Sequence, residues 1–242
     1  MLGTAERDYR ADPEEIEKLI GESELVFIGQ PNNPNGVQYN YEELLQFANA
    51  GERHGTYIVL DEAFIDFIPQ HRRQSLLPVL ERYPHLIIVH SMTKFYAIPG
   101  LRLGYGIAHP NVVDAMRNKQ VTWSVNSLAL RAGEISLQAG AEYEAATIAT
   151  ITTEREYLKA ELEKLSCKVC PGEANFLLVR LAASWTASGM QEALGRRGVL
   201  IRSCAMYAGL SERDIRVAVK DRAANAVLIR EMEKVIGGDY GW

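Results

Sequence analysis

Three short apolar runs, each followed directly by polar residues, constrain the fold of this chain more than any other feature. The runs at residues 25–29, 57–60 and 86–90 have the length and composition of buried strands. Helical stretches separate them, which is typical of an α/β protein with a mostly parallel sheet and helical layers. Because the carboxyl ends of parallel strands meet at one edge of the sheet, we expect the polar residues that follow them to lie near one another.

The helix signals agree with this pattern. Asp12 followed by Pro13 is typical of a helix start, and Asn40 with Glu43 forms a capping pattern that predicts a helix ending near His54. Another strand is predicted at residues 103–108, and a short helix near 76–80.

Beyond residue 111 the pattern changes to longer helices and a second group of strands. We predict a smaller C-terminal α/β domain and divide the chain into residues 1–145 and 146–242. The helices expected here are 112–119, 127–139, 142–165, 187–197 and 221–236, and the strands are 175–181, 199–203 and 214–219.

Composition excludes several functions. The 242 residues carry a net charge of −5, and the Lys and Arg residues are scattered, which disfavours a nucleic-acid partner. No apolar run approaches the roughly 20 residues of a membrane span, and the first residues lack the apolar core of a signal peptide. We therefore expect a cytoplasmic protein without a membrane partner.

The three cysteines do not form a disulfide framework. Cys167 and Cys170 have CxxC spacing, but the chain has no second such pair, and residues three apart in a strand face opposite ways. Two ordinary reduced thiols are favoured over a zinc or redox site. The five histidines show no metal-binding spacing, so no metal is expected.

The most informative chemistry lies in residues 91–105, SMTKFYAIPGLRLGY. Lys94 follows a predicted buried strand, where its amine can form a Schiff base with a carbonyl cofactor. Ser91 and Thr93 supply hydroxyls, and Arg102 supplies a guanidinium that can bind a phosphate in fork geometry. This set suits a carbonyl cofactor that also carries a phosphate. For a lysine after a strand, a solvated surface charge is the ordinary alternative.

With the segments PNNPNG at 31–36 and DEAFIDF at 61–67, this stretch resembles pyridoxal-phosphate enzymes of the aspartate-aminotransferase fold. The similarity extends from about residue 25 to the C-terminus. It is greatest in the branch that contains histidinol-phosphate aminotransferase and threonine-phosphate decarboxylase. The resemblance implies an aspartate-aminotransferase-like large domain that is truncated at its N-terminus, pyridoxal 5'-phosphate as cofactor, and a homodimer. The family's N-terminal portion is not recognised in residues 1–24, so we expect exposed apolar sheet surface.

The resemblance also implies roles for residues near the cofactor. Asp61 would face the pyridine nitrogen, Asn33 would donate its amide to the phenolic oxygen, and Lys94 would be the catalytic lysine. Glu62 would point the other way and be structural. Phe64 departs from many relatives, which have a tyrosine hydroxyl there as a second donor. Its ring can still pack against the cofactor.

Two arginines lie in the predicted C-terminal strands. A charge inside the apolar strand around Arg216 is costly unless it is paired. In the resembled family, the matching arginine binds the substrate carboxylate. Arg202, in the preceding strand, could add a second anion contact, which suits a substrate with a carboxylate and a phosphate. For both arginines, an edge-strand surface charge is the alternative.

The function that the resemblance implies is pyridoxal-phosphate-dependent decarboxylation of L-threonine O-3-phosphate to aminopropanol phosphate, a step of cobalamin biosynthesis. Asn33, Arg202 and Arg216 would contact this small phosphorylated amino acid. The first alternative is an aminotransferase of the histidinol-phosphate type. The second is an inactive remnant or a binding module with the same fold.

Overall fold

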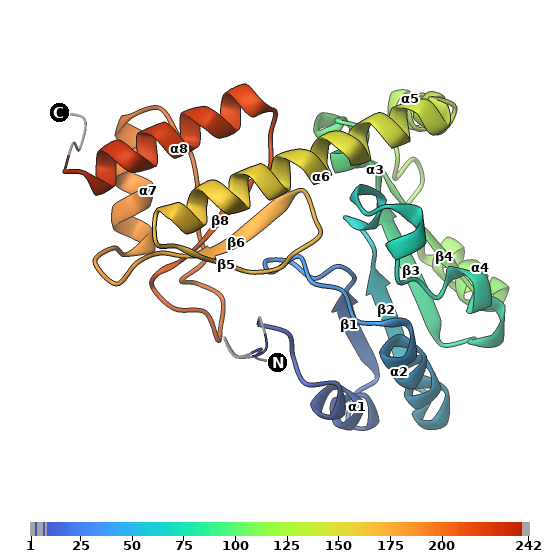
Figure 1. Ribbon diagram of the computed structural model, residues 1–242. Helices are drawn as coiled ribbons and strands as arrows, with labels where there is room; N and C mark the ends of the chain where they lie inside the picture. The colour runs from blue at the N-terminus through green and yellow to red at the C-terminus, as the bar shows by residue number, and fades with distance from the viewer. Residues whose placement is uncertain (1–2, 4–6, 8, 239–242) are drawn as a thin grey trace. The chain divides into compact units, whose positions relative to one another are not determined.

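The computed structural model describes residues 3, 7 and 9–238 (Figure 1). Contacts divide the chain into two compact units. The parallel-sheet unit comprises Asp12–Asn32 and Gln38–Thr147, and the antiparallel-sheet unit comprises the described residues of Met1–Ala11, Asn33–Val37 and Ile148–Trp242. Because short N-terminal segments group with the C-terminal half, these units are not continuous in sequence. The domain division at residue 145 therefore stays a prediction.

The first two helices form where their capping residues predict. Helix α1 (Pro13–Gly21) starts after Asp12, whose side chain accepts a hydrogen bond from the Glu14 amide. Helix α2 (Tyr41–His54) has a complete capping box, because Asn40 and Glu43 each accept a hydrogen bond from the other's backbone amide at 2.9 and 2.8 Å. It ends at Gly55, whose φ of 70° suits glycine.

The sheet of the parallel-sheet unit has the order β1-β2-β3-β4. Strands β1 (Leu25–Gly29), β2 (Tyr57–Asp61) and β3 (Leu86–Ser91) are parallel, as predicted. Strand β4 (Gly104–Ala108) pairs antiparallel with β3, with Ser91 opposite Gly104. The predicted α/β class and mostly parallel sheet are confirmed.

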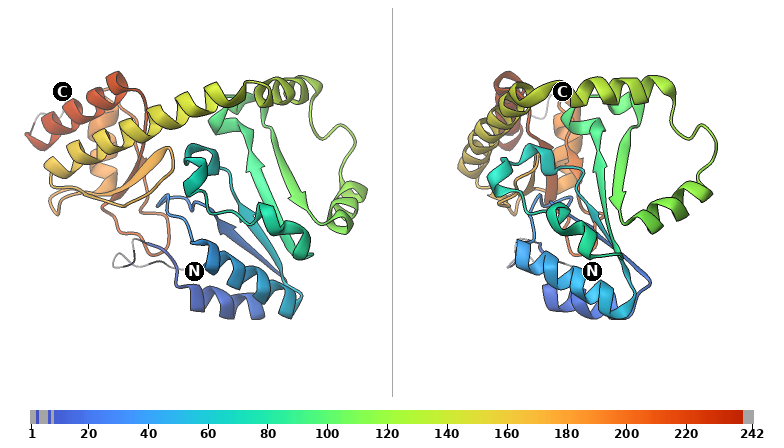
Figure 2. Two further views of the ribbon diagram at one scale, coloured as in Figure 1. Left: turned by 45° about the vertical axis from the view of Figure 1, so that its right-hand side comes forward. Right: turned by 90° about the vertical axis from the view of Figure 1, so that its right-hand side faces the viewer.

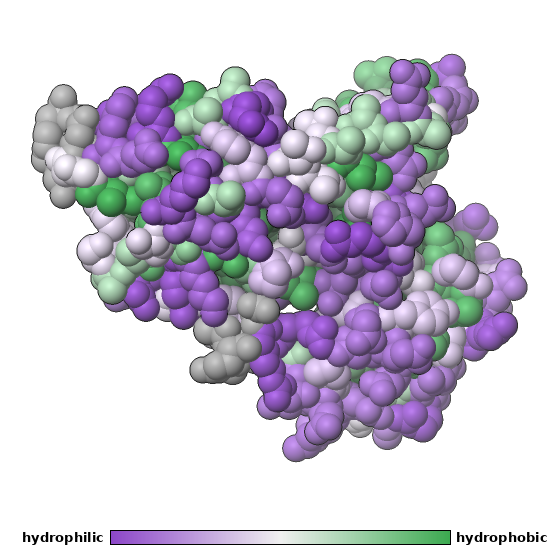
Figure 3. Space-filling model, viewed as in Figure 1, coloured by the Kyte–Doolittle hydropathy of each residue, from purple (hydrophilic) through white to green (hydrophobic). Residues whose placement is uncertain are grey.

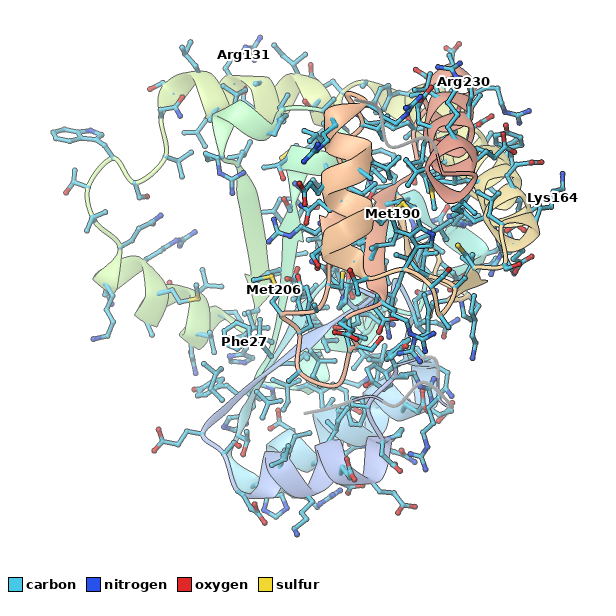
Figure 4. All side chains as sticks on the ribbon, turned by 90° about the vertical axis from the view of Figure 1, so that its left-hand side faces the viewer. Phe27, Arg131, Lys164, Met190, Met206 and Arg230 are labelled. Atoms are coloured by element: carbon cyan, nitrogen blue, oxygen red, sulfur yellow. The ribbon has the colours of Figure 1, made fainter. Side chains whose placement is uncertain are left out.

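The two faces of this sheet differ. Ile58, Leu60 and Ile88 point toward one face and are nearly fully buried. Helix α2 packs against β2 on this face and α1 packs against α2 (Figures 1 and 2). The outward surfaces of both helices are mainly hydrophilic (Figure 3). On the opposite face Leu25 and Phe27 are 48% and 70% exposed, and Figure 4 shows Phe27 on the side of β1 away from α1 and α2. Apolar side chains of β1 are therefore exposed on this face, as expected, whereas Val59 of β2 is buried.

Further helices complete the parallel-sheet unit. The chain between β2 and β3 forms 3₁₀ turns, so the short helix expected near residue 76 is a 3₁₀ helix, Leu77–Arg82. The remaining elements are the 3₁₀ helices η2 (Ile65–Phe67), η3 (Gln70–Arg72) and η5 (Pro99–Leu101) and the α-helices α3 (Met92–Phe95), α4 (Pro110–Lys119), α5 (Ser127–Leu137) and the start of α6 (Gly140–Lys164).

The antiparallel-sheet unit has the strand order β5-β6-β8-β7. Its elements are β5 (Lys168–Val169), β6 (Phe176–Arg180), α7 (Ala187–Arg196), β7 (Arg202–Ser203), β8 (Asp214–Ala218) and α8 (Arg222–Ile236). The predicted strand at 199–203 was too long. Only Arg202 and Ser203 pair with β8, and Leu200 is 89% exposed.

Helices cover one face of this second sheet. Leu177 and Val179 of β6 and Ile215 and Val217 of β8 pack in one cluster with buried residues of α6, α7 and α8. Because side chains alternate along a strand, Arg180, Asp214 and Arg216 point to the other face. Cys167 lies in the helix-side cluster, whereas Cys170 lies in a separate one with Leu178 and Cys204, which agrees with their predicted opposite orientation.

A cluster of opposite charges around Glu231 of α8 gives a pH-dependent prediction. Glu231 is 6% exposed and accepts hydrogen bonds from Lys234, Arg230 and Arg197, which lower its pKa to about 2. Because the folded pKa lies below the ordinary value of 4.5, this carboxylate stabilises the fold fully above pH 4.5. Its contribution is lost as the pH falls from 4.5 toward 2.

We therefore expect Glu231→Gln to lower the free energy of unfolding at pH 7, with a smaller loss at pH 3. Urea unfolding at both pH values measures this. Glu233→Gln, at an exposed position of the same helix, is the control. An equal loss at pH 7 and pH 3 would contradict the charge mechanism.

Among the described residues, no helix is long and apolar enough to cross a membrane.

Candidate active site

The end of β2 places two neighbouring carboxylates on opposite faces of the sheet. Asp61 is exposed, pairs in register with Gly29 and Val89, and accepts a hydrogen bond from the Ala63 amide at 3.1 Å. Glu62 is 1% exposed. The prediction that Glu62 points away from Asp61 is confirmed, and Asp61 is left open at the carboxyl edge of the sheet.

Glu62 belongs to a buried polar group that sequence reasoning did not find. Its Oε2 lies 2.9 Å from His90 Nε2, and the His90 ring stacks on Tyr105 of the neighbouring strand. Asp66 Oδ2 is 4.0 Å from His90 Nδ1. Burial raises the pKa of Asp66, and His90 and Arg73 oppose this effect. The group links β2 and β3 directly behind the exposed edge.

Lys94 lies on the short helix α3. The Ser91 side chain caps this helix, and its Oγ is 2.8 Å from Thr93 Oγ1. Thr93 and Phe95 are each 4% exposed, whereas Lys94 is exposed. The backbone is therefore held on both sides of the lysine while the amine is accessible. In the part of the chain that the structure describes, Lys94 Nζ makes no ion pair.

Arg102 has a strained backbone, with φ of 54° and ψ of 59°. A non-glycine residue in this left-handed region costs energy and is frequent at functional sites. Its Nη1 donates to the Pro99 carbonyl at 3.3 Å, and no carboxylate among residues 9–238 forms an ion pair with it. The guanidinium can therefore bind an external anion.

Phe64 lies three residues after Asp61, directly before η2. The parallel-sheet unit thus brings Asp61, Phe64, Ser91, Thr93, Lys94 and Arg102 to the carboxyl end of its parallel strands. These side chains offer an acid, a ring, two hydroxyls, an amine and a guanidinium.

The other candidates, Asn33, Arg202 and Arg216, belong to the antiparallel-sheet unit. Arg216 Nη1 donates to Asn33 Oδ1 at 2.5 Å, and its guanidinium lies 5.1 Å from the centre of the Phe176 ring. Because the Asn33 oxygen accepts this bond, the Nδ2 amide hydrogens of Asn33 point elsewhere and can donate.

Arg202 pairs in register with Arg216 on the adjacent strand. Like charges opposite each other in a sheet are unfavourable. No acidic side chain of the described residues forms an ion pair with either arginine. This pair of cations is the arrangement expected for binding a multiply charged anion.

These features define the class of the protein. It is an α/β protein with a lysine, an acid and anion-binding groups at one edge of a mostly parallel sheet. The family model "Aminotransferase class I and II" matches residues 3–232. The chain belongs to this family.

Individual relatives support this assignment. The chain is 38% identical over 225 residues to a threonine-phosphate decarboxylase of Salmonella typhimurium, a match that covers 92% of this chain and 60% of the relative. It is 32% identical over 216 residues to a histidinol-phosphate aminotransferase of Oleidesulfovibrio alaskensis, covering 88% and 55%. The chain therefore spans about 60% or less of the length of these curated relatives.

Solved structures have the same fold. The histidinol-phosphate aminotransferase of Clostridium acetobutylicum superposes with a TM-score of 0.89 and 31% identity, covering 95% of this chain and 69% of that one. The L-threonine-O-3-phosphate decarboxylase of Porphyromonas gingivalis has a TM-score of 0.77 and 25% identity, covering 88% and 65%. The histidinol-phosphate aminotransferase of Sinorhizobium meliloti, at 24% identity and a TM-score of 0.83, covers 94% and 62% and was solved with pyridoxal-5'-phosphate.

Proposed function

We propose that this protein uses pyridoxal phosphate to decarboxylate L-threonine O-3-phosphate to aminopropanol phosphate. The observation that carries the proposal is the cross-strand pair of Arg202 and Arg216, which has no acidic partner among the described residues. Such a pair suits a substrate with two anionic groups. The relative at 38% identity, whose name specifies this activity, supports the same choice.

The donor set fits the proposed cofactor. Ser91 and Thr93 would offer hydroxyls to its phosphate, and Arg102 would offer a guanidinium that forms no ion pair with a carboxylate of the described residues. The exposed Asp61 carboxylate would hold a proton on the pyridine nitrogen. The ring of Phe64 would pack against the cofactor without donating a hydrogen bond.

In this proposal, Arg216 orients the amide of Asn33. Since its Oδ1 accepts from Arg216, its Nδ2 would donate to the phenolic oxygen of the cofactor. Arg216 would bind the substrate carboxylate in fork geometry while it holds this amide in place. Arg202 would bind the substrate phosphate.

In this proposal, the reaction depends on which bond to the substrate's α-carbon breaks, and Lys94 carries the proton in either case. When bound, the cofactor supplies an electron sink for the pair released as a bond to the substrate's α-carbon breaks. In the decarboxylase, the bond to the carboxylate would break, CO₂ would leave, and Lys94, protonated at that stage, would donate a proton to the α-carbon in place of the carboxylate. Arg216 would orient the carboxylate so that this bond, rather than the C–H bond, is the one that breaks.

A histidinol-phosphate-type aminotransferase is the second candidate. The Clostridium acetobutylicum structure, at a TM-score of 0.89, favours it. In that reaction Lys94 would remove the α-proton instead, and the same residues would hold the cofactor.

We also expect a homodimer, which light scattering of the purified chain measures.

The test is to incubate the purified chain and pyridoxal phosphate with each substrate. Threonine phosphate should release one CO₂ for each aminopropanol phosphate formed. We expect Arg216→Lys to lower kcat/KM at least tenfold, because lysine keeps the charge but not the fork geometry. Amino transfer from histidinol phosphate, without CO₂ release, would support the second candidate. If neither reaction occurs in a folded sample, the chain is an inactive remnant or a binding module.

A further inference from the structure

We propose that Tyr143, in the first turn of α6, is a positioning residue for Lys94. The inference rests on the proposed function of Lys94, but not on which substrate reacts. Tyr143 Oη donates to the Phe95 carbonyl at 2.7 Å, one residue beyond the lysine. This contact lies within the parallel-sheet unit.

The geometry of α3 explains why this bond is important. A helix of four residues cannot satisfy its own last carbonyls, so these groups need external donors. At the start of the helix the Ser91 side chain is the cap, and near its end the Tyr143 hydroxyl serves the Phe95 carbonyl. Lys94 lies between these two fixed points.

Aromatic packing restricts the same segment. The Tyr143 ring is 5.8 Å from the Phe95 ring in edge-to-face geometry and stacks 6.0 Å from the Tyr96 ring. Phe95 also contacts Phe67 at 5.2 Å. Phe95 is therefore enclosed, and the lysine backbone cannot rotate without breaking these contacts.

Glu144, the residue after Tyr143, also anchors the first turn of α6. Glu144 Oε1 is 2.5 Å from Arg73 Nη2, and Arg73 also donates to the carbonyls of Ile68 and Asp66. Tyr143 and Glu144 thus fix the start of α6 to two parts of the parallel-sheet unit. This anchorage holds the Tyr143 hydroxyl at the lysine segment.

The first measurement uses the protein without cofactor. We expect amide hydrogen exchange in residues 94–97 to be about three- to tenfold faster in Tyr143→Phe, as the loss of one hydrogen bond implies. Tyr157→Phe, farther along the same helix, is the matched control, since its ring contacts Arg222 in the other unit. Unchanged exchange at 94–97, or equal acceleration throughout the protein, would overturn the inference.

The second measurement adds pyridoxal phosphate and borohydride. Mass spectrometry should find a smaller fraction of cofactor fixed on Lys94 in Tyr143→Phe than in the parent, at an unchanged melting temperature. Equal fractions would overturn the inference. If the parent itself fixes no cofactor, the proposed function fails, and the exchange measurement alone decides whether Tyr143 holds the lysine segment.

Discussion

Lys94→Ala is expected to abolish the covalent attachment of pyridoxal phosphate. The amine is exposed, whereas both neighbouring residues are 4% exposed, so removal of this side chain eliminates the reactive group without disturbing the core. The parent chain mixed with pyridoxal phosphate and reduced with borohydride should carry the cofactor mass on the peptide that contains Lys94. The variant should carry none there, although noncovalent binding through the phosphate can persist.

Lys168→Ala is the matched control, because Lys168 is an exposed lysine at a strand position of the antiparallel-sheet unit. It should leave the modification of Lys94 unchanged. If Lys94→Ala retained an equal amount of fixed cofactor on other lysines, the attachment would be nonspecific and the assignment of Lys94 would be wrong.

Of the substitutions proposed, we expect Asp214→Asn to cause the largest decrease in the free energy of unfolding. Asp214 is fully buried and accepts two bonds from Arg180 at 2.9 Å and two from Ser211 at 2.6 and 3.0 Å. Burial alone would raise the pKa of Asp214, but the hydrogen bonds from Arg180 and Ser211 outweigh it, so its pKa lies below the usual value. Removing one partner of a buried ion pair leaves the other uncompensated.

We expect a loss of about 3 kcal/mol in the free energy of unfolding at pH 7, measured by urea denaturation. This is the lower end of the usual range because the Arg180 side chain is 24% exposed. Asp221→Asn, at the exposed N-cap of α8, should cost far less because asparagine also caps helices. A loss below about 1 kcal/mol in Asp214→Asn would mean that Arg180 finds water in place of its partner.

Tyr9 is a further hydrogen-bond partner of Asp214, in addition to Arg180 and Ser211. Its hydroxyl lies 3.3 Å from both Asp214 oxygens, and burial, together with Asp214, raises its pKa to about 12. The bond joins residues 205 positions apart. No local pattern around Tyr9 could have predicted it.

Much of the parallel-sheet unit could be predicted because its signals are local. The Asn40 and Glu43 capping box depends on residues three apart, and the three parallel strands are short apolar runs. The strand expected at 199–203 was predicted too long for the opposite reason. Its apolar residues were suitable for a strand, but only Arg202 and Ser203 meet β8. Pairing with a distant strand, rather than propensity, decides where such an element ends.

The features of the candidate site fall into the same two groups: those that local sequence predicts and those that only tertiary packing decides. The sequence alone placed Asp61 and Lys94 after parallel strands, and topology then requires them to share one edge of the sheet. Only the tertiary structure decided that Glu62 pairs with His90 and that Tyr143 reaches the Phe95 carbonyl.

By itself, then, the sequence determined the α/β class, the helix starts and the residue types at the ends of the strands, because short-range sterics and apolar periodicity control them. The tertiary structure decided that Arg202 lies opposite Arg216 and that Arg216 orients the Asn33 amide. That last bond joins residues 183 positions apart. Contacts of this kind depend on how the elements pack, and neither residue's neighbours in sequence specify them.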